Sequence, residues 1–409
     1  MKGLPVVLSV AVVWTSVSRA GVELPPEPSN VPELLVTESG ERVTDVGLWE
    51  RVRKPEILKW FRENEYGERP VERPADLSFA EVRPPEPCYG GKAVSKLVRA
   101  TYSGPGGTGS MTFRVWIPKA DRPVAVFVHS SPRPAETAAD PEGPRPVYLL
   151  PAELIVSRGF ACIASCNREV AIDAHVPSAD ITTTGVFRVF GPEKMERRRP
   201  TEWGILSAWA WGASRIMDWI ETEPLLDASH VAIVGLSRNG KAALVAGVTD
   251  ERFALTVSCC SGCSGAKLNH VYTHGSEQVE GIMRNFPYWF CPNYGQWVGR
   301  ERKAMPYDQH EWIALIAPRL LYISSATEDV TAGPRGEFAS ALFASPAWGL
   351  YGVGGLGGRT FPAADAPMHA GHVGYHVRTG HHGITDFDWE RYMDFAEGKG
   401  WLIPHGGRK

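Results

Sequence analysis

Neither sign of charge dominates this 409-residue sequence, in which 43 Lys and Arg residues stand against 46 Asp and Glu residues for a formal net charge of -3. A chain without a strongly basic surface is a poor partner for nucleic acid or for anionic membranes, so we expect neither. Internal repeats and low-complexity segments are also missing, which argues against a solenoid. The composition, 43% hydrophobic and 22% charged, is that of an ordinary globular protein with a sizeable core.

Cysteine is scarce and offers no complete metal motif. The seven cysteines include one C-x-x-C pair, Cys260 and Cys263, but no second pair or H-x-x-x-H set follows at the spacing of a zinc site. We therefore interpret the pair as a disulfide or as buried thiols, and the odd total leaves at least one cysteine free. We expect no metal and no organic cofactor.

Long apolar runs are absent except for a short one at the start. Met1-Lys2 precedes an apolar stretch from Leu4 to Trp14, and small residues stand three and one positions before a cut after Ala20. This pattern predicts a signal peptide over residues 1–20, because the stretch is too short for a membrane anchor and ends in polar residues. We expect a secreted or periplasmic monomer that is free of the membrane after cleavage.

The rest of the chain is expected to form a lead-in and one domain. Residues 21–48 carry several prolines without helical periodicity, which predicts a lead-in along the surface. Over residues 49–409, β-branched runs alternate with amphipathic ones, which predicts a single α/β domain, a three-layer sandwich with a mostly parallel central sheet. The expected strands are 124–128, 161–164, 231–234, 255–258 and 320–323, and the expected helices are 49–66, 149–157, 205–220, 241–248, 312–316 and 389–396.

A serine between glycines marks a candidate nucleophile. Gly235-Leu236-Ser237-Arg238-Asn239-Gly240 connects an expected strand to the helix that begins near Lys241. In α/β-hydrolases such a turn presents the serine hydroxyl above the sheet, and the helix N-terminus that follows suits an oxyanion. Because Asn239 replaces the second glycine of the usual G-x-S-x-G pattern, the string alone fits a serine that merely caps a helix equally well.

A serine hydrolase of this fold also needs an acid and then a histidine further along the chain. Glu328 and Asp329 follow the expected strand 320–323, and His381 and His382 lie on a glycine-bounded loop before the last expected helix. Each signal alone is weak, because loop carboxylates are usually solvated and paired histidines are often a surface patch. Their order along the chain is nevertheless the order that a triad requires.

The turn around the serine belongs to a wider pattern. Gly235-Leu236-Ser237-Arg238-Asn239-Gly240-Lys241 resembles a G-C-S-R-x-G-K or G-H-S-R-x-G-K signature. Further matching stretches are R-K-P-E-I-L-K-W-F at 53–61, W-G-I-L-S-A-W-A-W-G-A-S-R-I-M-D at 203–218, T-D-E-R-F-A-L at 249–255, F-P-Y-W-F-C-P-N at 286–293, D-Q-H-E-W-I-A-L-I-A-P-R at 308–319 and G-Y-H-V-R-T-G at 374–380. In content and order they resemble the bacterial glucuronoyl esterases of carbohydrate esterase family 15, which implies an α/β-hydrolase fold.

The resemblance implies a role for each matching catalytic residue. Ser237 matches the nucleophile, and His382 matches the base because it stands two residues after the glycine that Gly380 matches. His381 is then only a neighbour. Arg238 matches the arginine that stabilises the oxyanion through its backbone N–H and its guanidinium, a fixed charge where negative charge develops.

The sugar-binding residues follow in the same way. Lys241 matches a lysine that hydrogen-bonds the sugar hydroxyls. A glutamate that contacts the sugar is expected at Glu277, or about one helical turn further along at Glu280. Thr331 stands where many members have a tryptophan that packs against the sugar, and without that aromatic face we expect some loss of specificity.

The catalytic acid is the position at which this chain departs most from the family. Many members place a glutamate in an E-S-G string after the strand that follows the nucleophile helix, but here the string reads Cys260-Ser261-Gly262. A thiol does not replace a fixed carboxylate as the partner of an imidazole, which closes that route. Other members carry the acid in an E-D-x-W-A-D-P loop, so Asp329 is the expected acid, with Glu328 as the second choice.

The function implied is that of a serine carboxylesterase acting on esters of (4-O-methyl-)D-glucuronic acid, the bonds that join glucuronoxylan to lignin alcohols. Its partner is then a lignin-carbohydrate ester. Two other interpretations stay open: an acetyl-xylan or feruloyl type of esterase, and a catalytically silent polysaccharide-binding protein. The replacements at Cys260 and Thr331 are the features that favour the silent protein.

Overall fold

The computed structural model describes residues 31–173, 181–192, 197–271, 275–301 and 304–401. The predicted signal peptide, residues 1–20, and the first part of the lead-in lie outside the described residues. Within the described part, no helix has both the length and the apolar character needed to cross a bilayer.

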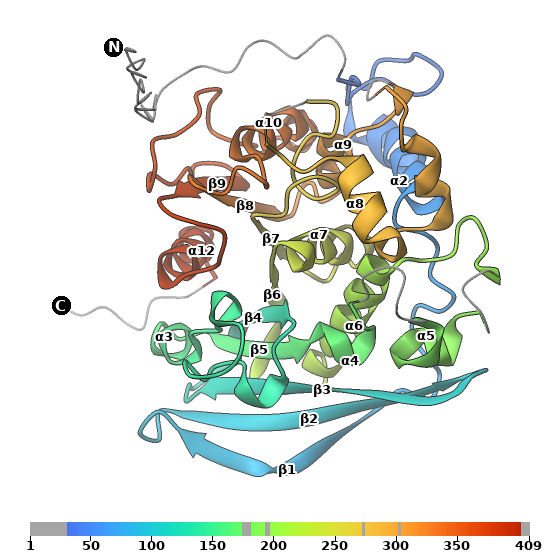
Figure 1. The fold of residues 1–409 in the computed structure, drawn as a ribbon. Helices are drawn as coiled ribbons and strands as arrows, with labels where there is room; N and C mark the ends of the chain where they lie inside the picture. Colours follow the sequence, from blue (N-terminus) through green and yellow to red (C-terminus); the bar gives the residue numbers. More distant parts are fainter. Residues whose placement is uncertain (1–30, 174–180, 193–196, 272–274, 302–303, 402–409) are drawn as a thin grey trace, which may run out of the picture.

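A single nine-stranded sheet forms the centre of the molecule (Figure 1). Its spatial order is β1-β2-β3-β5-β4-β6-β7-β8-β9, and the last six strands in that order run parallel to one another, whereas β1, β2 and β3 are antiparallel. The strands are β1 (Ser78–Cys88), β2 (Ala93–Gly104), β3 (Gly107–Pro118), β4 (Val124–Ser131), β5 (Ala161–Cys166), β6 (Leu226–Leu236), β7 (Leu255–Cys259), β8 (Leu320–Ala326) and β9 (Val373–Arg378).

Helices cover both faces of the parallel part of the sheet. In Figure 1, α3 and α12 lie on one face, and α6, α7 and α10 lie on the other. The helices are α1 (Val46–Leu48), α2 (Lys54–Asn64), α3 (Ala152–Ser157), α4 (Asn167–Val170), α5 (Gly185–Phe190), α6 (Ile205–Ile220), α7 (Arg238–Thr249), α8 (Val279–Asn285), α9 (Gln309–Ala314), α10 (Pro334–Ala344), α11 (Pro346–Leu350) and α12 (Asp386–Gly398). The three-layer sandwich predicted from the alternation of runs and the α/β-hydrolase fold implied by the family resemblance are both confirmed.

Strand β4 shows why the sheet is buried on both faces. Phe127 packs edge-on against Phe160 and Trp389 on the side of α3 and α12, with ring centroids 5.1 and 6.0 Å apart. Its neighbours Val126 and Val128 point the other way, into the larger core cluster. Successive side chains of a strand alternate between faces, so an uninterrupted apolar run fits a strand with helices on both sides.

Each expected strand and helix is present, with shifted ends. The structure also contains elements that were not predicted, namely the strands β1, β2, β3 and β9 and the helices α1, α4, α5, α8, α10 and α11. The lead-in differs from its prediction, because Val31, Leu34 and Val43 are buried in the core rather than spread over the surface. All seven cysteines fall among the described residues and are free thiols, so of the two interpretations of Cys260 and Cys263 the buried thiols are correct.

Candidate active site

Ser237 lies in a strained turn between β6 and α7. Its φ of 61° and ψ of -127° are unusual for a residue with a side chain, and its N–H donates to the Cys259 carbonyl oxygen at 2.8 Å. A Cβ atom at Gly235 would lie 2.1 Å from the Asn239 carbonyl oxygen, so only glycine fits there. This is the geometry of a nucleophile elbow at the carboxyl end of a central strand.

Asn239, which departs from the usual pattern, fits the turn for a visible reason. Its side chain is buried, and its Oδ1 accepts a hydrogen bond of 2.8 Å from Nδ2 of Asn167, the first residue of α4. Asn239 therefore takes the place of the second glycine without obstructing the elbow, because its side chain is directed to Asn167.

His382 is paired with Asp329. Nδ1 of His382 lies 2.6 Å from Oδ2 of Asp329, and the Asp329 side chain is 4% exposed. Burial alone would raise the pKa of Asp329, but the hydrogen bond and charge of His382, with smaller contributions from the Ala332 N–H and the Cys260 thiol, hold that pKa below its ordinary value. Asp329 is thus a carboxylate that orients an imidazole.

Glu328 is directed elsewhere. Its carboxylate lies 3.1 Å from Nδ1 of His381, and both side chains are more than half exposed. The structure therefore brings together two adjacent acid–histidine pairs, of which only the pair of Asp329 and His382 is partly buried.

The buried Arg378 side chain holds the loop that carries His382. The Arg378 guanidinium donates to the carbonyl oxygens of His381 and Gly383, on either side of His382, at 2.9 and 3.0 Å. Nε of Arg378 is held in turn by the Asp388 carboxylate at 2.9 Å, and Asp388 also completes the capping box of α12. The position of the imidazole is therefore fixed by the end of β9 and the start of α12.

The serine turn and the histidine–aspartate pair meet at the end of β7. Ser237 is hydrogen-bonded to Cys259, the last residue of that strand, and the next residue along is Cys260. Ligand atoms of Cys260, Asp329 and His382 all lie within 4.8 Å of one another. Residues 237, 329 and 382 therefore each follow the carboxyl end of a strand, β6, β8 and β9, within the parallel part of the sheet.

Cys260 lies beside the expected acid instead of acting as one. A hydrogen bond with the Cys259 thiol, burial, and the negative charges of Glu337 and Asp329 raise the pKa of the Cys260 thiol well above its ordinary value. A neutral thiol donates to Asp329 and leaves that carboxylate as the partner of His382. Among the described residues, Cys260, Asp329 and His382 are the group whose side chains could hold a metal ion.

Arg238, the first residue of α7, is held on two sides. Its Nη1 lies 2.6 Å from Oδ2 of Asp173, and its guanidinium lies over the rings of Phe286 and Trp289 at 5.0 and 4.9 Å from their centroids. The Trp289 indole N–H donates to the other oxygen of Asp173 at 3.2 Å. The guanidinium next to the elbow is therefore anchored by one carboxylate and two aromatic faces.

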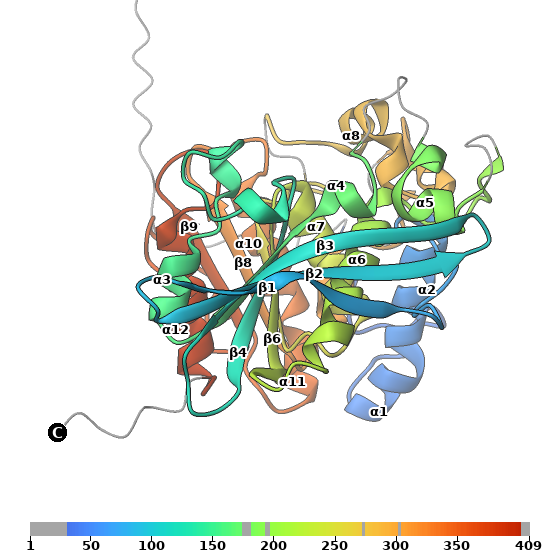
Figure 2. The ribbon, with the colours of Figure 1, turned by 90° about the horizontal axis from the view of Figure 1, so that it is seen from below.

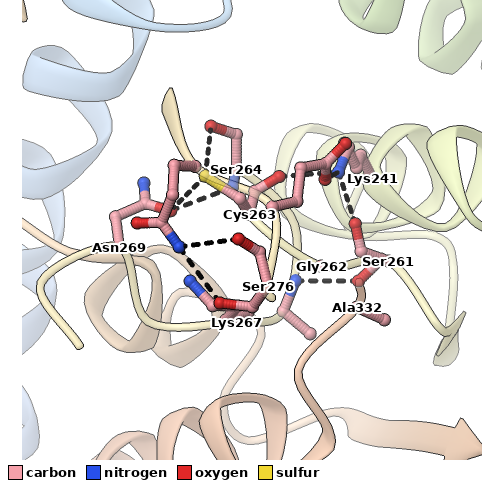
Figure 3. Close-up of polar contacts among 12 residues, drawn as sticks. Lys241, Ser261, Gly262, Cys263, Ser264, Lys267, Asn269, Ser276 and Ala332 are labelled. Atoms are coloured by element: carbon pink, nitrogen blue, oxygen red, sulfur yellow. Dashed lines mark hydrogen bonds and ion pairs between the residues drawn. The ribbon is translucent and has the colours of Figure 1, made fainter. Parts of the chain in front are cut away.

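Lys241 is turned into the loop that follows β7, as Figure 3 shows. Its Nζ donates to the carbonyl oxygens of Ser261 and, at 2.6 Å, Cys263. It also forms an ion pair of 2.9 Å with Glu277. Of the two candidate glutamates, the structure therefore brings Glu277 to Lys241.

Glu280 lies in the first turn of α8, among a separate set of residues that includes Asn269, Trp297 and Arg300. Thr331, by contrast, lies beside the ion pair, because its carbonyl oxygen accepts the Glu277 N–H at 2.8 Å. The position without an aromatic side chain thus adjoins the expected sugar-binding residues.

Sequence reasoning missed Asp173, Trp289 and Phe286 as parts of the site. Trp289 and Phe286 fall in the stretch 286–293 that was noticed only as a family match. Asp173 stands 65 positions before Arg238, and no local pattern connects the two. Cys260 was identified as the position that lacks the usual glutamate, and its contact with Asp329 could not be predicted from spacing.

The chain is similar in sequence to known carbohydrate esterases. The family model described as "Glucuronyl esterase, fungi" matches residues 139–352. Among curated proteins, the chain is 31% identical to Carbohydrate esterase MZ0003 from an unknown prokaryotic organism, over 90% of this chain and 89% of that protein. It is 28% identical to 4-O-methyl-glucuronoyl methylesterase 1 of Wolfiporia cocos, over 63% and 62%.

Solved structures resemble the chain over almost its full length. A glucuronoyl esterase from Solibacter usitatus superposes with a TM-score of 0.82 at 33% identity, covering 92% of this chain and 98% of that one. A promiscuous CE15 esterase from a marine bacterial metagenome gives a TM-score of 0.79 at 30% identity, covering 90% and 96%. The similarity therefore extends through both the sheet and the helices that cover it.

Proposed function

This chain belongs to the glucuronoyl esterase family and is a carboxylic ester hydrolase, and we propose that it cleaves esters of (4-O-methyl-)D-glucuronic acid with Ser237 as the nucleophile. The observation that carries the proposal is the 2.6 Å contact of Asp329 with His382, at the strand ends where the Ser237 elbow lies. The names of related proteins, such as the 4-O-methyl-glucuronoyl methylesterase of Hypocrea jecorina, support this substrate class.

In the proposed mechanism, His382 accepts the Ser237 proton while Asp329 orients the imidazole. The serine oxygen attacks the C6 carbonyl of the uronate ester, and the N–H and guanidinium of Arg238 stabilise the oxyanion. His382 then protonates the leaving alcohol. Water, activated by the same histidine, releases the uronic acid from the acyl-enzyme.

Lys241 and Glu277 are proposed to bind the sugar ring. Lys241 already bonds two main-chain carbonyls and one carboxylate, so its position is set before substrate arrives. A preorganised cation and carboxylate suit the hydroxyls of a sugar and cost little ordering on binding. The natural alcohol is proposed to be a lignin alcohol attached to glucuronoxylan.

Broader ester specificity is a second candidate, favoured by Thr331. This residue carries no aromatic face for a sugar ring, and one structural relative is described as promiscuous. An acetyl-xylan or feruloyl type of activity would then accompany, or replace, uronate ester cleavage.

Hydrolysis rates of methyl glucuronate, methyl galacturonate and p-nitrophenyl acetate test these proposals side by side. We expect methyl glucuronate to have the highest kcat/KM and Ser237→Ala to abolish its turnover while the circular dichroism spectrum stays unchanged. Preference for p-nitrophenyl acetate would support the second candidate. Full activity of Ser237→Ala would refute the proposed nucleophile.

Export and a monomeric domain over residues 49–409 are further parts of the proposal, with the lead-in from residue 21 packed on that domain through Val31, Leu34 and Val43. N-terminal sequencing of protein recovered outside the cytoplasm should give Gly21 as the first residue. Size-exclusion chromatography with light scattering should give the mass of one chain. Retention of residues 1–20 in the exported protein would contradict the proposed cleavage.

A further inference from the structure

Cys260 places a sulfur atom next to a histidine nitrogen and a carboxylate oxygen. The three ligand atoms of Cys260, Asp329 and His382 lie within 4.8 Å of one another, although they come from three loops that are far apart in the sequence. Asp329 and His382 are already 2.6 Å apart. A small adjustment would therefore place all three atoms at bonding distance from one central ion.

The donor set is that of a zinc-like cation. Thiolate sulfur, imidazole nitrogen and carboxylate oxygen are the three ligand types that zinc takes in proteins, and three protein ligands leave its fourth position open to water. The local field also favours a cation, because the charged Asp329 carboxylate acts on the Cys260 thiol. The Arg378 guanidinium acts on the same thiol with positive charge.

We propose that Cys260, Asp329 and His382 form a binding site for a zinc-like divalent cation, and that occupation of this site inhibits the esterase. The inhibition rests on the proposed function, because the same Asp329 and His382 act there as acid and base. A metal bound to the imidazole and the carboxylate replaces the hydrogen bond between them and prevents His382 from accepting the serine proton. On binding, the Cys260 thiol proton is released to solvent and no redox change occurs.

The imidazole is the solvent-accessible member of the group. The His382 side chain is 41% exposed, whereas Cys260 and Asp329 are 2% and 5% exposed. An incoming ion would therefore meet the imidazole first and then the buried sulfur.

Metal binding is tested without any activity measurement. Cobalt(II) chloride is titrated into the metal-free wild-type protein, and the near-ultraviolet thiolate-to-cobalt charge-transfer band is followed. Zinc affinity is measured by competition with a fluorescent zinc chelator, for wild type, Cys260→Ala and the control Cys88→Ser, which removes a more accessible thiol outside the site. We expect one tight zinc per chain, and affinity at least about tenfold weaker for Cys260→Ala alone, since losing a ligand should cost no less than losing an outer-shell partner.

Zinc chloride inhibition is then measured as the fraction of each protein's own zinc-free rate. We expect the concentration for half-inhibition to rise at least about tenfold in Cys260→Ala and to stay unchanged in Cys88→Ser. Equal zinc affinity of wild type and Cys260→Ala, or no thiolate band in the wild type, would overturn the proposed site. Tight zinc binding without inhibition would overturn the proposed link between the site and catalysis. If the zinc-free wild type has no esterase activity but the protein still binds zinc, only the proposed function is contradicted.

Discussion

Asp329 and His382 are in direct contact through Oδ2 and Nδ1 at 2.6 Å, whereas the adjacent pair of Glu328 and His381 lies exposed on the surface. The two carboxylates are neighbours in sequence and were both candidate acids. Their side chains point to different histidines, and only the contact of Asp329 is shielded from water, where a charged hydrogen bond has its greatest effect.

We therefore predict that Asp329→Asn lowers kcat on methyl glucuronate by about 10⁴-fold, because the amide no longer stabilises the imidazolium. The matched variant Glu328→Gln should stay within about twofold of wild type, since its partner His381 is solvent-exposed. Steady-state kinetics of the two variants checks this. A large loss in Glu328→Gln with an active Asp329→Asn would reverse the assignment.

Asp173 is predicted to act through Arg238 as a positioning residue. In Asp173→Asn the guanidinium loses its charged partner, and we expect kcat to fall about tenfold with little change in KM, a smaller loss than the 10²–10³-fold typical of a deleted oxyanion donor. The control Asp394→Asn removes a carboxylate that pairs with Arg158 at 3.0 Å and with Arg391 at 2.7 Å, away from the elbow, and should leave both constants unchanged. A change in melting temperature without a change in kcat would show that Asp173 is only structural.

Glu277 is predicted to bind substrate together with Lys241. Glu277→Gln should raise KM for methyl glucuronate about tenfold and leave kcat almost unchanged, because the lost contact is made equally in the ground and transition states. Rates on p-nitrophenyl acetate, which has no sugar, should not change. Glu280→Gln is the matched control, and a KM effect in that variant instead would move the sugar contact to α8.

Glu337 is predicted to make stability depend on pH. It is buried beneath the active-site loop, where it accepts the N–H groups of Ser261 and Gly262 at 2.7 and 3.0 Å, and burial raises its pKa to about 7. Because the folded-state pKa exceeds the unfolded value, the folded protein holds a proton that the unfolded chain has lost between pH 4.5 and 7. Its contribution to stability is therefore full at low pH and is lost as pH rises through about 7.

Glu337→Gln should remove this dependence, since the amide keeps a carbonyl acceptor and carries no charge. Chemical denaturation at a series of pH values should show a difference in the free energy of unfolding between wild type and variant. This difference should grow with pH, by up to about 3 kcal/mol. A difference that does not vary with pH would mean that Glu337 stays in one protonation state throughout.

Most of the parallel sheet could be predicted because its strands are buried on both faces and read as continuous apolar runs. Strand β1 could not, since most of its residues are exposed, three of them are prolines, and its pairing with β2 contains register shifts. Such an edge strand is defined by its neighbour and leaves little periodicity in its own sequence.

The parts of the site whose residues are close together in the sequence could be predicted. Contacts between residues that are far apart in the sequence could not. The elbow at Ser237 is a strand, a turn and a helix in one short stretch, so its spacing was informative. The choice between Asp329 and Glu328, and the contact of Arg238 with Asp173, depend on how separate loops approach each other. The departure at Asn239 was likewise explained only by its buried partner, Asn167.

His382 is proposed to activate Ser237, and covalent labelling measures this activation most directly. A fluorophosphonate probe reacts rapidly only with an activated serine, and the site of modification is read by mass spectrometry of the digested protein. The proposed mechanism predicts one label per chain, on Ser237, formed at least about 10²-fold more slowly in a folded His382→Ala variant. Labelling of a different serine, or an equal rate in His382→Ala, would contradict it.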